Sequence, residues 1–124
     1  MLSPYEQIGG EKTVRAIVEK FYAKVQQHPL LAPLFPEDIQ PVMERQYLFL
    51  TQFLGGEPLY TQKRGQPMLR ARHLPFPITK KHAEAWLLCM HEALDEVGIT
   101  GMVRNQIWSR LEMTAFHMVN QSDE

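Results

Sequence analysis

The chain has 124 residues, of which 44% are hydrophobic and 22% charged, and its formal net charge is −1. This length fits one domain with a substantial core, so we expect a single domain over residues 1–124. The near-zero charge and the lack of a long basic run argue against nucleic acid as a partner. No apolar run approaches the roughly 20 residues that span a bilayer, which argues against a membrane protein. One cysteine cannot form an internal disulfide and no export signal is recognisable, so we expect a cytoplasmic location.

Apolar residues recur with the period of an α-helix in four long segments. The first covers residues 11–27, and the second begins near residue 37 and ends at Gly55 and Gly56. The third follows Thr79 as its cap and ends at Gly98, and the fourth follows Thr100 as its cap. Residues 57–66 are polar and rich in turn formers, which predicts a loop. No segment alternates with period two, so the predicted fold class is all-α.

A fifth, very short helix is predicted around His73, within the stretch PMLRARHLPFPIT at residues 67–79. Pro67 can open a helix because its missing N–H needs no partner there, and Pro75 and Pro77 end it. A helix of about two turns is not stable alone, so something large and apolar must hold it. A histidine flanked by Arg70 and Arg72 favours an iron porphyrin with acidic propionates.

Other metal centres fit this sequence less well. His91 and Glu92 begin the HExxH pattern of zinc proteases, but Asp95 stands where the second histidine belongs. His82 and the following residues match half of a zinc-deaminase signature, yet the required pair of cysteines is absent. Haem supplies its own equatorial ligands, so one protein histidine suffices. On the residues alone, however, a lone histidine on a helix is more often a structural residue than a metal ligand, so both interpretations of His73 stay open at this point.

Three of the long segments place a residue with a polar tip inside the apolar stripe, namely Tyr22, Gln46 and Trp86. A buried polar atom without a partner costs about 1–3 kcal/mol, so the three side chains need an explanation. Either each finds a local partner, or all three donate to one small, partly negative ligand. Dioxygen on ferrous iron has that partly negative character.

The sequence resembles the truncated haemoglobins, specifically the bacterial-type group II branch, over nearly its whole length. The resemblance is carried by Gly9-Gly10, Phe21-Tyr22, HPLLAPLFP at 28–36, FLTQFLGGEPLY at 49–60, RGQPMLRARHLPFPIT at 64–79, and Ala85-Trp86. It implies a two-over-two helical sandwich around haem b, which is iron protoporphyrin IX.

The resemblance also implies residue roles. His73 falls on the family's iron ligand, and Tyr22, Gln46 and Trp86 fall on its distal ligand-binding positions. Phe35 stands where relatives often carry a tyrosine, so the distal network is expected to rest on Tyr22 and Trp86. Arg72 and Tyr60 match propionate partners. The complete set of expected haem-pocket residues is Phe35, Val42, Phe49, Leu50, Tyr60, Met68, Leu69, Arg72 and Phe76.

The implied ligands are dioxygen, carbon monoxide and nitric oxide. Hydrogen bonds to bound dioxygen predict tight binding and slow release, which suits storage or sensing. The alternative is a redox enzyme acting on the bound ligand, by nitric oxide dioxygenation or peroxidase-like chemistry, and it would need a separate reductase. A sensor, or an interaction module without haem, is a third interpretation. Group II relatives are often dimers, so the resemblance also allows a homodimer.

Overall fold

The computed structural model describes residues 2–123 and contains, within them, seven α-helices, one 3₁₀ helix and no strand. The predicted all-α fold class is therefore confirmed. In chain order the elements are α1 (Pro4–Ile8), α2 (Glu11–Val25), the 3₁₀ helix η1 (Ala32–Leu34), α3 (Gln40–Phe53), α4 (Leu59–Arg64), α5 (Leu69–His73), α6 (Lys80–Val97) and α7 (Gly101–His117). Within residues 2–123, none of these helices combines the length and apolarity that crossing a membrane requires.

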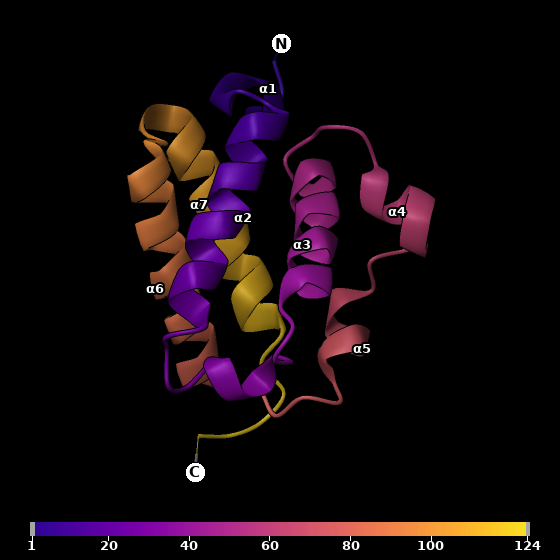
Figure 1. Ribbon diagram of the computed structural model, residues 1–124, viewed down its shortest axis with the longest axis vertical. Helices are drawn as coiled ribbons and strands as arrows, with labels where there is room; N and C mark the ends of the chain where they lie inside the picture. Colours follow the sequence, from indigo (N-terminus) through magenta and orange to yellow (C-terminus); the bar gives the residue numbers. More distant parts are fainter. Residues whose placement is uncertain (1, 124) are drawn as a thin grey trace.

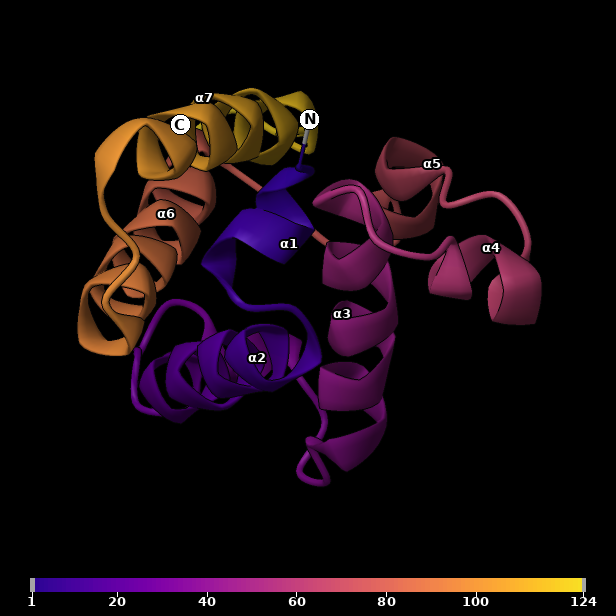
Figure 2. The ribbon, with the colours of Figure 1, turned by 90° about the horizontal axis from the view of Figure 1, so that it is seen from above.

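The four long helices pack in two pairs. Figure 1 shows α2 between α6 and α3, and these two contacts are the most extensive between helices in the described chain. Helix α7 packs along α6, and Figure 2 shows this second pair from above. Helices α4 and α5 lie beside α3, on the side away from α2, and α5 also reaches the end of α7. The fold is thus a helical sandwich with two short helices at its edge.

Helix α2 supplies the centre of the core. Its predicted apolar stripe is the buried face, and Val14, Phe21 and Val25 have no exposed surface. Burying one such side chain contributes about 1.5–3 kcal/mol, so this face anchors α3 and α6 on either side. Tyr22 belongs to the same buried face, and its ring packs against Phe21 and Phe35.

The ends of α6 agree with the predicted signals. The Thr79 hydroxyl accepts a hydrogen bond from the backbone N–H of His82, and Nδ1 of His82 accepts one from the backbone N–H of Thr79. This reciprocal capping box satisfies two donors at the helix start. Gly98 ends the helix in the left-handed conformation, with φ +88°. His82 therefore serves the helix terminus.

Two local predictions are wrong. Residues 57–66 were expected to form a loop, but they contain α4, which has no side-chain cap. The Gln52 side chain on α3 bonds both the backbone N–H and the hydroxyl of Thr61, so α4 is held from another helix. Pro67 does not open α5, because Met68 turns the chain through a left-handed conformation and the helix begins at Leu69.

Helix α1 also lacks a counterpart among the expected elements. Ser3 and Glu6 form a capping box at its start. Gly9 and Gly10 then turn the chain into α2 with φ +113° and +73°, a conformation that strains any residue with a side chain.

Candidate functional site

His73 is the last residue of α5, and its ring is half-buried. Its Nδ1 lies 2.6 Å from the carbonyl oxygen of Leu69, one helical turn earlier. A carbonyl oxygen only accepts, so Nδ1 carries the proton in this contact. The lone pair then sits on Nε2, the form in which a histidine binds a metal, with its ring orientation set by the backbone.

The other histidines that resemble metal motifs are used differently. His82 caps α6, and His91 contacts Asp95 and the guanidinium of Arg104 on the surface. Across residues 2–123 no group of three or more His, Cys, Asp or Glu side chains could hold a metal ion. His73 therefore remains the candidate metal ligand.

Tyr22 is the most deeply buried of the predicted distal residues, at 4% exposure. Its ring packs edge-on against Phe21 at 4.8 Å and against Phe35 at 5.8 Å between centroids. Burial raises the pKa of the Tyr22 hydroxyl, while the charge of Arg45 acts in the opposite direction. The hydroxyl is therefore neutral at physiological pH and is available as a donor.

Trp86 lies on α6 and Gln46 on α3, and both are half-buried. The Trp86 ring packs on Phe21 at 5.0 Å, so Phe21 contacts both Tyr22 and Trp86. None of the three polar tips bonds to another residue of the described range, so local partners do not explain them. In residues 2–123 only the Thr51 hydroxyl is both sealed from solvent and unpaired, so the polar tips of Tyr22, Gln46 and Trp86 keep some contact with solvent.

The residues that are expected to line the haem pocket differ in how far they are buried. Val42, Leu50 and Tyr60 are buried, Phe35, Phe49 and Leu69 are half-buried, and Met68, Arg72 and Phe76 are exposed. The two expected propionate partners do lie together, because the Arg72 guanidinium carbon is 5.6 Å from the centre of the Tyr60 ring. Arg72 also donates to the carbonyl oxygens of Arg64 and Gln66, at 3.1 and 3.2 Å.

Two cavities lie near this region. One of about 580 Å³ separates α5 from α7 and is lined by Met68, Leu69 and Met118, among others. A smaller one of about 190 Å³ is lined by Phe35 and by the end of α2. Neither of these two cavities is lined by His73 or by Tyr22.

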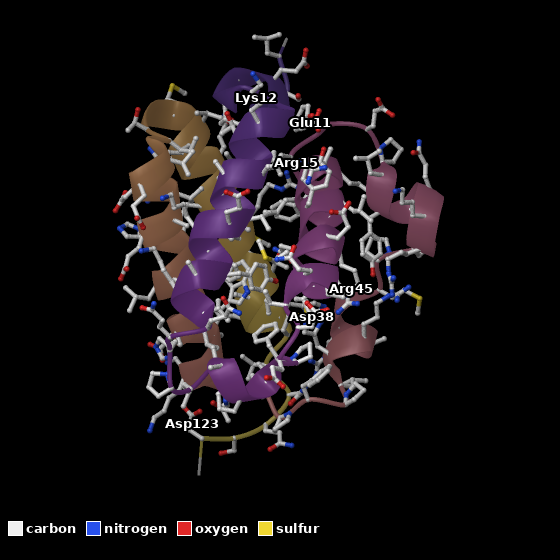
Figure 3. All side chains as sticks on the ribbon, viewed as in Figure 1. Glu11, Lys12, Arg15, Asp38, Arg45 and Asp123 are labelled. Atoms are coloured by element: carbon white, nitrogen blue, oxygen red, sulfur yellow. The ribbon has the colours of Figure 1, made fainter. Side chains whose placement is uncertain are left out.

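Arg45 is a residue of this region that the sequence did not single out. Figure 3 shows it on the N-terminal half of α3, and its charge acts on the buried Tyr22 hydroxyl. Its neighbour Gln46 attracted notice because it interrupts an apolar stripe. An exposed arginine on a helix gives no such signal, so only the folded structure relates it to Tyr22.

Comparison with known proteins identifies the family of this chain. The family model for bacterial-like globins matches residues 3–120. A group 2 truncated haemoglobin of Bacillus subtilis is 54% identical over 121 residues, which cover 98% of this chain and 91% of that protein. The crystal structure of the group II truncated haemoglobin of Bacillus anthracis matches with a TM-score of 0.98 at 51% identity, covering 100% of this chain and 95% of that one. The X-ray structure of a truncated oxygen-avid haemoglobin of Bacillus subtilis matches at 0.93 and 55%, covering 96% and 100%. The chain therefore belongs to the bacterial-like globin family and, within it, to the group II truncated haemoglobins.

Proposed function

We propose that this protein holds haem b through His73 and binds dioxygen tightly through hydrogen bonds from Tyr22, Trp86 and Gln46. Membership of the globin family implies a haem cofactor and small gaseous ligands. The observation that carries the finer proposal is the Tyr22 hydroxyl, which is buried and neutral and has no partner within residues 2–123. Such a group can donate its hydrogen bond to a small ligand that reaches it.

The residues present fit a haem. Nε2 of His73 would bind the iron, because Nδ1 is engaged by Leu69. Arg72 and Tyr60, which already lie together, would hold the acidic propionates. Phe35, Phe49 and Leu69 would contact the macrocycle. When bound, the haem supplies the iron at which a diatomic ligand is held.

The distal residues would then decide which ligand stays. A hydrogen bond to a ligand with negative character is worth about 1.5–3 kcal/mol. Because this hydrogen bond must break when the ligand leaves, each 1.4 kcal/mol that it contributes slows dissociation by about tenfold. Carbon monoxide is far less polar than bound dioxygen, so the same donors favour dioxygen. Slow release suits storage, sensing or chemistry on the bound ligand better than bulk transport.

The replacement of Tyr22 by phenylalanine tests this proposal. We expect Tyr22→Phe to release dioxygen at least about tenfold faster, because one charge-assisted hydrogen bond is lost. Carbon monoxide release should change much less. Stopped-flow displacement of each ligand from the reduced protein measures both rates.

Tyr47→Phe is the matched control, since Tyr47 is also buried but its ring lies against the guanidinium of Arg15, near the start of α2. It should leave both rates unchanged. Equal dioxygen release from the Tyr22→Phe variant and the unmodified protein would refute the assigned role of Tyr22.

A further inference from the structure

Helix α5 needs support from outside itself. It has five residues, too few for a helix to persist alone. It packs extensively against no other helix in the described part of the chain, and none of its residues is fully buried. The position of His73 therefore depends on contacts other than helix packing.

One such contact joins α5 to the end of α7. The Arg70 guanidinium, through Nη1, donates to the carbonyl oxygens of His117 and Val119, at 3.1 and 3.0 Å. The last carbonyls of a helix have no partner within it, and positive side chains stabilise that end. Residues 117–121, here called the C-terminal strap, thus hold α5 through its second residue.

Asn120, within this strap, makes a second attachment, and this one reaches His73 itself. Its Nδ2 donates to the carbonyl oxygen of His73 at 3.3 Å and to that of Phe76 at 2.9 Å. Its Oδ1 accepts from the backbone N–H of Ile78 at 3.0 Å, and its own backbone N–H donates to the Ile78 carbonyl at 2.9 Å. Two donors and one acceptor are all used, a combination that an amide side chain supplies and a carboxylate or an alanine does not.

We infer that Asn120 is a positioning residue for the histidine that binds iron. The bond from Nδ1 to Leu69 fixes the His73 ring relative to α5, and Asn120 fixes the end of α5 relative to α7. The two together set the direction of Nε2. The inference rests on the proposed function, because it takes His73 as the iron ligand, and it makes the C-terminal strap part of the proximal site.

The test compares Asn120→Ala and Asn120→Asp with Gln121→Ala. Gln121 is the neighbouring exposed residue, and its bond to Ile78 comes from the backbone, so its replacement keeps that bond. The readouts are the iron–histidine stretching band of the reduced, unliganded protein in resonance Raman spectra and the rate of haem transfer to an excess of apomyoglobin.

We expect both Asn120 variants to shift or broaden the iron–histidine band and to lose haem about tenfold faster, as expected for the loss of about one hydrogen bond. Asn120→Asp has nearly the same shape, but its carboxylate faces two carbonyl oxygens to which it cannot donate. Gln121→Ala should match the unmodified protein. If Asn120→Ala loses its helical circular dichroism, the test uses Asn120→Asp and Arg70→Gln instead. Both are expected to show the same change in the iron–histidine band and the same faster loss of haem.

Hydrogen exchange of the haem-free chains separates this inference from the proposed function. Amides of α5 should exchange faster in the Asn120 variants, while those of α2 should not. An unmodified protein that takes up no haem would refute the proposed function, and the exchange rates would still test the strap. Asn120 variants that equal the unmodified protein in band, haem loss and exchange would overturn the inference.

Discussion

Within residues 2–123, the buried residues Tyr22 and Thr51 both carry a hydroxyl without a hydrogen-bond partner, and the surroundings of the two hydroxyls differ. The Tyr22 hydroxyl can be reached by a small ligand, whereas that of Thr51 on α3 is sealed off by its neighbours. A sealed, unpaired hydroxyl is a cost to the folded state and brings no binding in return. The same kind of atom is thus proposed to be functional in one place and is only destabilising in the other.

We predict that Thr51→Val stabilises the protein by about 1 kcal/mol, because the replacement keeps the shape and removes the unpaired hydroxyl. Thr61→Val is the matched control, since the Thr61 hydroxyl accepts a hydrogen bond from Gln52 at 2.9 Å. That variant should lose about 1 kcal/mol. Urea unfolding gives both values, and a loss of stability in Thr51→Val would contradict the prediction.

The candidate site residues could be predicted from the sequence to the extent that they break a local pattern. Tyr22, Gln46 and Trp86 interrupt apolar stripes, and His73 lies in a segment bounded by prolines. Their roles in the folded protein remain proposals. Asn120 breaks no pattern, and its side-chain partners lie 42 to 47 residues earlier in the chain. Such a contact exists only once α5 and α7 have met.

At the scale of the elements, the long helices could be predicted because their signals are local. Apolar spacing and terminal residues lie within the segment that they describe, as Thr79 and Gly98 do for α6. Helix α4 could not be predicted from its own residues, because its support comes from Gln52 on α3. The start of α5 was misplaced for a related reason, since Met68 adopts a positive φ of 44° that no residue type announces.

The two threonines that were predicted as caps should differ in their effect on stability. The Thr79 hydroxyl accepts from the helix backbone, whereas Thr100 makes no side-chain capping bond at the start of α7. Thr79→Ala should therefore cost about 1 kcal/mol. Thr100→Ala should stay within about 0.5 kcal/mol of the unmodified protein. Chemical denaturation of both variants measures the difference, and equal losses would count against this assignment of the caps.

For the whole molecule, the all-α architecture and the truncated globin fold are established by the helices and by the solved relatives. The helical sandwich brings Tyr22 and Trp86 onto one phenylalanine, Phe21, from α2 and α6. It leaves α5, with His73, beside α3 and fastened to the end of α7. In the proposed function, a flat group would bind between α5 and the side chains of Tyr22 and Trp86.

The most direct test of the account is the absorption spectrum of the protein and of His73→Gly, in the oxidised and reduced states, with and without carbon monoxide. His117→Ala is the matched control, because His117 is the histidine at the neighbouring end of α7. The account predicts an intense Soret band that shifts with carbon monoxide in the unmodified protein and in the control. In His73→Gly the band should be lost and restored by added imidazole. The absence of a Soret band after titration with hemin, or an unchanged band in His73→Gly without imidazole, would contradict it.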